Sequence, residues 1–567
     1  MYVRATPRRN KDGSVVRYLQ LAHNVWDPVA KRSKAQVIYN FGREDESSRA
    51  AIERLVASLS RFLAPEAALA SSVGEGFAFL ESRPLGGSYA LDGLWRRLGI
   101  DALLRRALKG RRRDLSAERV LFALVANRAL APSSKLAAAR WVAEDVHIEG
   151  LPETSDDACY RAMDWLLEIS EAVEKEVFHA VASLLNLEVD LLFFDTTSTY
   201  FCADEADEPV ARNERGEVTD TDDQATRQAG FRSYGHSKDH RDDLPQVIIG
   251  MAVTREGIPV RVWSWPGNSA DVSLLAQVKA DLREWTLGRV VWVADRGFAS
   301  SENRRLLRRG DEHYIMAERL RGGSAEAVAA LARAGRYREL AGNLRIKEVR
   351  ISGAERFVIC HNPDAAARDA AVRARLLARL EAMIAGSDAL PPTKRAELRG
   401  AISTKPGLAR LLRTTPGGLL RLDAAAIKAE ERLDGTYLLR CSDPALSAEE
   451  IALGYKQLWQ IERAWRDMKR IIDLRPVYHR KEERIRAHVL LCWLALLLVR
   501  VAENACDGSW ANLRRELERI KLGSFAGPTG SFSQRTELTA AQRAILAKLQ
   551  LAEPPRISEL SPAALAS

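Results

Sequence analysis

The region from residue 187 to residue 318 constrains the fold most strongly, because strand and helix patterns follow one another there in a definite order. Runs of apolar and β-branched residues predict five strands, at 188–195, 244–254, 258–265, 289–295 and 313–318. Helical periodicity predicts two helices, in VSLLAQVKADLREW before the fourth strand and in SSENRRLLRRG after it. This succession predicts a central mixed sheet with helices on its faces.

Three strands, a helix, a strand, a helix and a strand is the order of a ribonuclease-H-like fold. A chain of 567 residues is too long for one hydrophobic core, so several domains are expected. We predict a multidomain α/β protein in which a β-rich insertion interrupts this core, and a β unit and an all-α domain precede it. The predicted boundaries are 1–48 for the β-rich unit, 49–186 for the helical domain, 187–318 for the first part of the core, 319–444 for the insertion, 445–505 for the rest of the core and 506–567 for a C-terminal helical tail.

Basic residues are in slight excess and are clustered. The chain has 85 Lys and Arg against 76 Asp and Glu, a formal net charge of +9, which is compatible with a polyanionic partner. The stretch RRALKGRRR (105–113) is mostly basic and ends in Arg111, Arg112 and Arg113. A predicted helix, turn and helix follow it, with the break at Pro132. We predict that 49–186 binds DNA and that the basic run contacts phosphates; a solvated loop is the alternative.

Cysteine usage and apolar runs indicate a reducing, aqueous compartment. The six cysteines form no CxxC pair and lie at no zinc spacing from a histidine. The amino terminus, MYVRATPRRNKDG, lacks the apolar region of a signal peptide. The longest apolar run, VLLCWLALLLV (489–499), is far shorter than the ~20 residues that a bilayer requires. We predict a cytoplasmic, nucleoid-associated bacterial protein that contacts no membrane, with this run as a buried core helix.

Two aspartates lie at the ends of predicted strands. Asp195 ends the first strand in FFDTTSTYF, and Asp295 ends the fourth strand in VVWVADRGF. One carboxylate at a strand end usually caps a loop. Two such carboxylates on strands of one sheet can instead meet at the same edge.

A third carboxylate lies on the helix predicted from YKQLWQIERAWRDMK (455–469). At ~100° per residue, Tyr455, Leu458, Glu462, Arg466 and Lys469 share a face of about 80°, beside an apolar arc that would bury the flank of the helix. A solvated ladder of i,i+4 charge pairs is the alternative interpretation of this stripe.

Together, Asp195, Asp295 and Glu462 predict a metal-dependent catalytic site. Mg²⁺ and Mn²⁺ prefer oxygen ligands of this kind. Two such ions, about 3.5–4 Å apart, can activate a water or a 3′-hydroxyl and stabilise the leaving oxygen in phosphoryl transfer. The polar side chains of the helical stripe would then face the phosphates of the strand that is cut.

Besides the arginines of the basic run, five further residues are candidates for contact with DNA. They are Tyr455, Arg466 and Lys469 on the stripe, and Lys238 and Arg241 in GHSKDHRDDLPQV (235–247). For Lys238 and Arg241, a solvated loop remains the alternative.

These motifs resemble those of bacterial DDE insertion-sequence transposases, and specifically of the insertion-sequence-four superfamily, whose signature is Y-x2-R-x3-E-x6-K. Tyr455, Glu462 and Lys469 match the signature at the required spacing. Asp195 in DTTSTYF and Asp295 in ADRGF match the two aspartate motifs. The long interval between Asp295 and Glu462 resembles the β-rich insertion of this branch.

The resemblance implies Mg²⁺- or Mn²⁺-dependent DNA cleavage and strand transfer on double-stranded DNA, with terminal inverted repeats and target DNA as substrates. It also implies a DNA-hairpin intermediate and a homodimer in the active complex. One position departs from the family pattern, because Leu458 replaces the arginine of the signature. A phosphate contact that the resemblance implies is therefore missing there.

Two other functions fit parts of the sequence. A decayed or domesticated transposase would bind DNA without cutting it, although all three carboxylates are present. A phosphatase of the haloacid-dehalogenase type would form an aspartyl-phosphate on the aspartate of FFDTTST. That family requires a second aspartate two residues further on, where this chain has Thr197.

Overall fold

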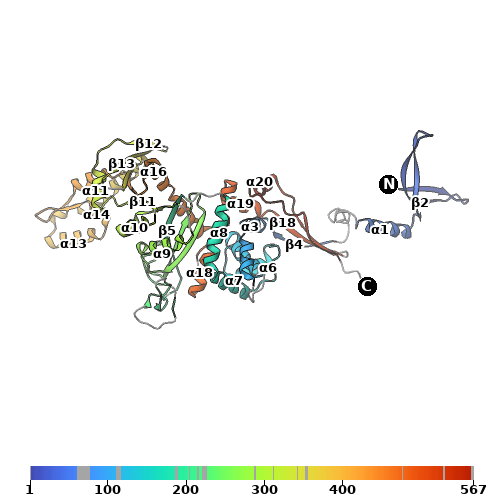
Figure 1. Ribbon diagram of the computed structural model, residues 1–567, viewed down its shortest axis with the longest axis horizontal. Coiled ribbons are helices and arrows are strands. Elements are labelled where there is room, and N and C mark those ends of the chain that lie inside the picture. Colours follow the sequence, from blue (N-terminus) through green and yellow to red (C-terminus); the bar gives the residue numbers. More distant parts are fainter. Residues whose placement is uncertain are drawn as a thin grey trace. The chain divides into compact units, whose positions relative to one another are not determined.

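The protein forms two compact units in the computed structural model (Figure 1). The structure describes residues 2–60, 77–109, 116–185, 190–203, 205–213, 216, 218–219, 227–285, 289–310, 312–340, 342–351, 355–475, 477–527 and 530–562. Unit 1 comprises Met1–Arg83, Lys521–Glu537 and Pro554–Ser567, and unit 2 comprises Pro84–Ile520 and Leu538–Glu553. Every predicted site residue that the structure describes lies in unit 2.

Unit 1 begins with a three-stranded antiparallel sheet. Its strands are β1 (Tyr2–Arg9), β2 (Val15–Asp27) and β3 (Arg32–Arg43), and helix α1 (Glu46–Ser60) follows. A turn through Gly13, whose positive φ of 87° suits glycine, joins β1 to β2. The predicted amino-terminal β unit is therefore confirmed.

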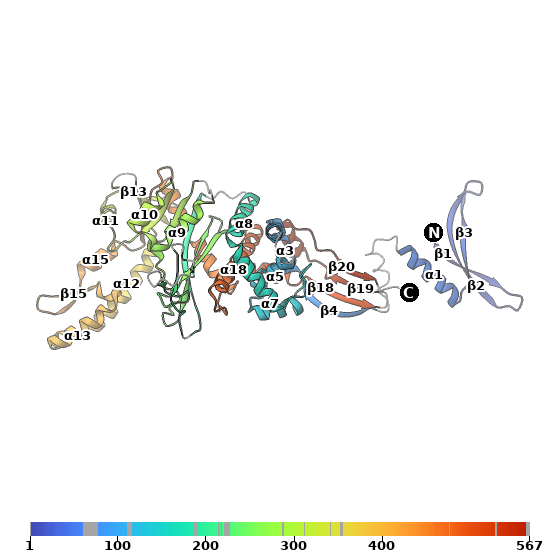
Figure 2. The same ribbon diagram turned by 60° about the horizontal axis from the view of Figure 1, so that its bottom comes forward.

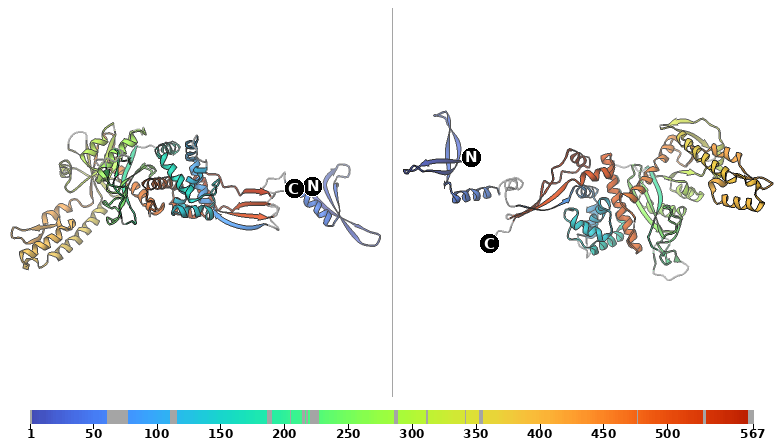
Figure 3. Two further views of the ribbon diagram at one scale, coloured as in Figure 1. Left: turned by 90° about the horizontal axis from the view of Figure 1, so that it is seen from below. Right: turned by 180° about the vertical axis from the view of Figure 1, so that it is seen from behind.

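Unit 1 also contains a four-stranded sheet in the order β20-β19-β18-β4, whose strands lie side by side in Figure 3. The strands are β4 (Ala78–Pro84), β18 (Lys521–Gly527), β19 (Gly530–Arg535) and β20 (Ile557–Pro562). The prediction of a helical tail over 506–567 was wrong for this part of the chain. Phe525 and Phe532 pair across β18 and β19 with stacked rings, 5.1 Å between centroids, and such cross-strand aromatic pairs stabilise sheets.

Helices of unit 2 pack around one long apolar helix, α18 (Glu482–Cys506); Figure 2 shows α5 and α7 beside it. The others are α3 (Gly86–Arg97), α4 (Ile100–Leu108), α5 (Ser116–Leu130), α6 (Lys135–Glu144), α7 (Asp156–Glu168), α8 (Ser170–Leu185), α19 (Trp510–Leu517) and α20 (Ala540–Lys548). By length and composition α18 could cross a membrane, but 94% of its apolar window is buried inside the protein. The predicted buried core helix is confirmed.

A nine-stranded sheet forms the rest of the core of unit 2, and one half of it follows the predicted order. This half comprises β5 (Leu191–Tyr200), β8 (Gln246–Val253), β9 (Pro259–Pro266), β10 (Val291–Ala294) and β11 (His313–Glu318), with α9 (Asp271–Arg283) and α10 (Ser301–Leu307) between the later strands. The spatial order is β9-β8-β5-β10-β11. Strands β5, β10 and β11 are parallel, whereas β8 and β9 are antiparallel to their neighbours. The pair β6 (Val210–Ala211) and β7 (Arg227–Gln228) forms a separate small sheet.

The other half of this sheet corrects the prediction of a separate β-rich insertion at 319–444. Its strands are β12 (Arg338–Leu340), β13 (Leu344–Arg350), β14 (Arg356–His361) and β17 (Thr436–Cys441), and they continue the core sheet in the order β11-β17-β14-β13-β12. Strand β17 pairs antiparallel with β11. An unpaired edge of β11 would expose backbone donors and acceptors, and β17 satisfies them.

Between β14 and β17 the chain forms a mainly helical lobe instead of β structure. The lobe contains α12 (Pro363–Ile384), α13 (Pro392–Ser403), α14 (Pro406–Ala409), α15 (Ala424–Glu431) and the hairpin β15 (Leu412–Thr414) and β16 (Leu420–Leu422), while α11 (Ala325–Ala332) precedes β12. It has its own small core of Leu380, Ile402, Leu408 and Leu411. At its base, His361 of β14 pairs with Thr436 of β17.

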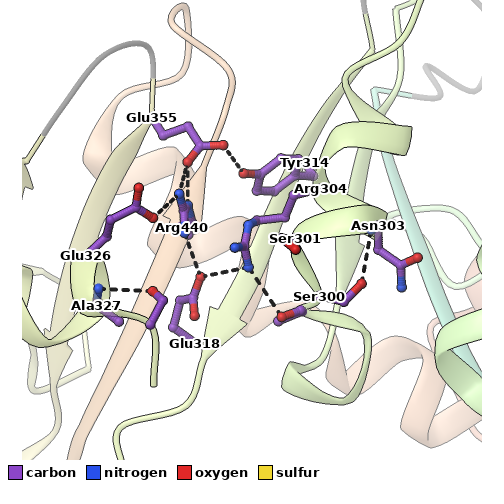
Figure 4. Close-up of polar contacts among 12 residues, drawn as sticks. Ser300, Ser301, Asn303, Arg304, Tyr314, Glu318, Glu326, Ala327, Glu355 and Arg440 are labelled. Atoms are coloured by element: carbon purple, nitrogen blue, oxygen red, sulfur yellow. Dashed lines mark hydrogen bonds and ion pairs between the residues drawn. The ribbon is translucent and has the colours of Figure 1, made fainter. Parts of the chain in front are cut away.

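A buried ion network joins the two halves of the sheet (Figure 4). Arg440 on β17 bonds Glu318 at the end of β11, Glu326 on α11, and Glu355 before β14. Arg304 on α10 lies 3.3 Å from Glu318. Tyr314 extends the network by donating a hydrogen bond to Glu355. Each charged group in this network therefore has a partner of opposite charge.

Candidate active site

Asp195 and Asp295 come from two neighbouring parallel strands. Asp195 is the fifth residue of β5, and Asp295 directly follows β10. The register pairs Phe194 with Ala294, so Asp295 leaves the sheet beside the middle of β5. The burial of the preceding apolar residues of both strands fixes this register. The predicted strand end at Asp195 was wrong, because β5 continues to Tyr200 by pairing with β8.

Glu462 comes from a helix that is shorter than predicted. The stretch 455–469 is not one helix: α16 (Ala448–Lys456) ends within it and contains Tyr455, whereas α17 (Trp459–Arg470) contains Glu462. The chain tightens at the junction, where the Leu458 amide bonds the Tyr455 carbonyl three residues back. The prediction of one continuous helix with a single 80° polar face was therefore wrong across this junction.

The junction nevertheless leaves the three predicted carboxylates around one cavity of about 430 Å³. Its lining residues are Asp195, Asp295, Leu344, Asn362, Tyr437, Tyr455, Lys456, Leu458, Trp459, Ile461 and Glu462. Residues that are far apart in the sequence thus meet where β10 ends beside the middle of β5. Their assignment as catalytic groups remains a prediction.

Asp195 lies in a dense electrostatic environment that the sequence did not reveal. The Lys238 ammonium lies 3.8 Å from Asp195 Oδ1 and 3.0 Å from Asp271 Oδ2, and it donates to the Thr196 carbonyl at 2.7 Å. Burial raises the pKa of Asp195 to about 6; Lys238 opposes this rise, and the carboxylates of Asp271 and Asp295 add to it. Negative charge is therefore in excess at this edge of the sheet.

Asp295 is held by the tyrosine of the predicted signature. Tyr455 donates its hydroxyl to Asp295 Oδ1 at 3.1 Å. Burial, with the Asp295 charge, raises the pKa of the Tyr455 hydroxyl, which keeps it protonated as a donor. Tyr455 thus contacts a carboxylate in this structure, where the sequence predicted a contact with phosphate.

Lys469 also has a protein partner. Its ammonium lies 3.0 Å from Asp239 Oδ1, and Arg475 Nη1 lies 2.7 Å from the other oxygen of the same carboxylate. Burial lowers the pKa of Lys469, and Asp239 opposes this effect. On the same helix α17, Arg466 is exposed.

The other predicted DNA contacts differ in their surroundings. Arg241 pairs with Asp243 at 2.8 Å and lies over the Tyr200 ring. Lys238 faces the carboxylates described above. Arg111, Arg112 and Arg113 lie outside the described residues, so the predicted basic patch remains a prediction.

Sequence reasoning missed two aspartates beside this cavity. Asp271 begins α9, and its carboxylate accepts from the Thr196 hydroxyl at 2.6 Å. Asp239 lies in the loop before β8. Asp271 had a usable signal, since it opens a helix after a core strand, whereas Asp239 is one charge among several in GHSKDHRDDLPQV.

The donor set fits Mg²⁺ or Mn²⁺, because three carboxylates from separate elements line one cavity. Within the described parts of the chain, however, no group of three or more His, Cys, Asp or Glu side chains is close enough to enclose an ion. Ion binding would therefore draw the carboxylates together. All six cysteines are free.

Comparison with protein families gives the class of the molecule. Residues 214–498, about half of the chain, match the transposase DDE domain. The chain therefore belongs to the DDE transposase family. Residues 3–69 also match the IS1634 family transposase, N-terminal domain, so the chain is similar to the insertion-sequence transposases of that family.

Comparison with curated proteins finds no match. Among solved structures, the chain is similar to the cryo-EM structure of the piggyBac transposase synaptic complex with hairpin DNA, with a TM-score of 0.34 and 12% sequence identity. The alignment covers 76% of this chain and 78% of that chain. Family membership rests on the match of 214–498, which includes Asp295 and Glu462 and begins after Asp195.

Proposed function

We propose that the chain is the transposase of an insertion sequence, which binds the terminal inverted repeats, cleaves the DNA ends and joins each 3′-hydroxyl to target DNA. The observation that supports this most directly is the convergence of Asp195, Asp295 and Glu462 on one cavity. The strand order β9-β8-β5-β10-β11 supports a ribonuclease-H-like core. The match of Tyr455, Glu462 and Lys469 to the signature supports the insertion-sequence-four superfamily.

The carboxylates of Asp195, Asp295 and Glu462 are the groups that would hold the divalent ions. Such ions activate the attacking water or 3′-hydroxyl and stabilise the oxygen that leaves. Tyr455 orients Asp295 through its hydroxyl. Lys469 and Arg475 bring two cations to the carboxylate of Asp239, and the net positive charge of this trio favours a DNA phosphate nearby.

The remaining parts of the proposal follow the resemblance described above. The active complex contains two copies of the chain on double-stranded DNA, and the cleaved ends pass through a DNA hairpin. Residues 49–186 contribute DNA contacts, together with the exposed Arg466 on α17. The protein works in the bacterial cytoplasm on the nucleoid.

A DNA-binding protein that no longer cuts is a second candidate. Two observations favour it: Leu458 lines the cavity where the signature has arginine, and no three acidic or other ligating side chains of the described residues lie within reach of one ion. This candidate shares the DNA-binding step and lacks the chemical step.

Cleavage of the element's own ends separates these two functions. Purified full-length protein and Mg²⁺ are incubated with labelled duplex DNA that carries the terminal repeat, and products are resolved on a denaturing gel. We expect nicking at the repeat end by the wild type and none by Asp195→Asn. A matched control is Asp190→Asn, because Asp190 is an exposed aspartate just before β5 whose partner is Arg255. Specific binding without any nicking would leave the second candidate.

A further inference from the structure

Two neighbouring residues of opposite charge in one loop contact two of the elements that carry the predicted carboxylates, β5 and α17. Lys238 extends towards the β5 side, where its ammonium contacts Thr196 and Asp271. Asp239 extends towards the helix that contains Glu462, where it contacts Lys469 and Arg475. Because Cα atoms of adjacent residues are about 3.8 Å apart, the loop fixes the distance between these two sets of contacts.

The loop itself is held in a defined conformation. The Lys238 amide donates to Ser198 Oγ on β5 at 2.9 Å, and the Ser237 amide donates to Asp242 Oδ1 at 2.6 Å. Ser237 is buried, and His240 adopts a positive φ of 58° to close the turn. A loop with such anchoring transmits a restraint from one partner to the other.

The flank of α17 that faces away from the loop is held by α18. The contribution of the loop to the position of α17 can therefore be measured separately. On that flank, Asp467 accepts from Arg500 of α18 at 2.7 Å, and Arg463 bonds Glu503 of α18 at 2.8 Å. Ile461 is among the apolar residues of α17 buried in the core. Towards the cavity, by contrast, Glu462 is exposed. On the sheet side α17 packs against β5 and β8, and a charged contact there joins Lys469 to Asp239.

Charge makes Asp239 more important than an ordinary loop residue. Lys469 experiences repulsion from both Arg475 and Lys238. The Asp239 carboxylate, only 13% exposed, is the group that bonds Lys469 and Arg475 together. Without its charge, Lys469 and Arg475 would face each other without a shared carboxylate in a partly desolvated space, and their repulsion would move α17 away from the sheet.

We propose that Lys238 and Asp239 act as a positioning pair that sets how closely Glu462 approaches Asp195 and Asp295. The proposal rests on the proposed function, because it assigns the pair to the assembly of that catalytic site. Asp239 is thus a positioning residue that acts through Lys469 and α17, and it touches no reacting atom itself.

The test compares Asp239→Asn with Asp243→Asn in the full-length protein. Asp243 lies in the same loop but is exposed and pairs only locally with Arg241, so its variant is the matched control. Hydrogen exchange measured by mass spectrometry reports on α17 through peptides covering 459–470. Calorimetric titration with Mn²⁺, without DNA, reports on the metal site.

For Asp239→Asn we expect faster exchange in 459–470 and an affinity for Mn²⁺ lower by about 10-fold, the effect typical of losing an outer-shell partner. Exchange in the β5 and β10 peptides should stay unchanged. Asp243→Asn should match the wild type in both measurements. Equal effects of the two variants, or an Asp239→Asn protein with wild-type exchange and Mn²⁺ affinity, would overturn the proposal.

A second variant approaches the same contact from the helix. Lys469→Met should raise exchange in 459–470 as Asp239→Asn does, and the double variant should add little to either, because both remove one interaction. Additive effects would overturn the pairing. Tighter DNA binding by Asp239→Asn with unchanged α17 exchange would also overturn it, since Asp239 would then only compete with phosphate for Lys469. Failure of wild-type DNA cleavage would refute the proposed function but not these exchange results.

Discussion

Two clusters of charged side chains on the same sheet are built in opposite ways. At β11 and β17, Arg440 is 5% exposed and pairs with the buried Glu318, with Glu355 and with the more exposed Glu326. Glu318 also pairs with Arg304, and Glu355 accepts a hydrogen bond from Tyr314. At β5 and β10, a single ammonium that is 32% exposed, Lys238, faces the carboxylates of Asp195 and Asp271. The first cluster is closed and the second is open with acid in excess.

The difference shows where a charge cluster serves structure and where it serves chemistry. A buried cluster that pairs every charge resists change, because removing one partner leaves another charge buried and unpaired. In the open cluster, burial raises the pKa of Asp195 to about 6, and the charges of Asp271 and Asp295 add to this rise. A cation arriving from solution relieves the surplus of negative charge there. Substitutions in the open cluster should therefore change catalysis, and substitutions in the closed cluster should change stability.

The largest expected effect is on the chemistry of the open cluster. Asp295→Asn should slow DNA cleavage by at least about 10⁴-fold, the equivalent of roughly 5 kcal/mol, because it removes a proposed metal ligand. Binding to terminal-repeat DNA in a gel-shift assay should persist, and the free energy of unfolding should change by less than about 1 kcal/mol. A folded variant that loses binding together with cleavage would count against the assignment.

The next effect is on the stability of the closed cluster. Arg440→Met should lower the free energy of unfolding in urea by about 3–5 kcal/mol, because it leaves Glu318, Glu326 and Glu355 without their shared cation. Arg308→Met is the control: Arg308 lies 3.7 Å from Glu355 but is 46% exposed, so its loss should cost less than about 1 kcal/mol. Similar losses for the two variants would contradict the contrast between the clusters.

The open cluster should also make stability depend on pH. The pKa of Asp195 is 3.8 as a free side chain and about 6 in the folded protein, so the folded state binds the proton more tightly between these values. The stability that this proton contributes is fully present below pH 3.8 and is lost as the pH rises through about 6. In EDTA, raising the pH from 4 to 7 should cost the wild type about 1–2 kcal/mol more than Asp195→Asn, a figure discounted for partial exposure. The free energy of unfolding in urea, measured at several pH values, should fall more steeply for the wild type than for Asp195→Asn. An equal dependence on pH in the two proteins would contradict the raised pKa of Asp195.

The smallest expected effect concerns the cation beside the open cluster. Lys469→Ala should slow single-turnover cleavage by about 10-fold, or roughly 1.4 kcal/mol, because one charge near a phosphate is lost. Arg466→Ala, on the exposed face of the same helix, should mainly weaken DNA binding as salt rises. A Lys469→Ala rate equal to the wild type at saturating DNA and Mg²⁺ would count against both a phosphate contact of Lys469 and its role in positioning Glu462.

Local patterns sufficed to predict the half of the sheet that holds the aspartates. The apolar runs that precede Asp195 and Asp295 form β10 and the first half of β5, and their parallel pairing brings the two aspartates together. The continuation of β5 to Tyr200 was not predicted. Glu462 could be found by its spacing from Tyr455 and Lys469. These features depend on residues that are close in the sequence, or on the rule that parallel strands pair side by side in such a sheet.

The rest depended on pairings between distant segments. The junction at Leu458 replaces one helix by two, although every residue of the stretch favours helix or tolerates it. Strand β17 pairs with β11 although the helical lobe separates β17 from β14 in the sequence. No local pattern indicates a pairing between segments that are so far apart. Likewise, Asp239 and Lys469 contact each other although they lie far apart in the sequence. In its own segment, each residue has the pattern of an ordinary solvent-exposed charge.

The pairing of His361 with Thr436 makes the whole helical lobe, topologically, the loop of a β-hairpin. The entropy of closing a loop grows only with the logarithm of its length. Related chains can therefore enlarge, shrink or exchange this lobe at little cost to the sheet. Natural variation in size should accumulate there, while the register that places Asp295 beside Asp195 stays the same.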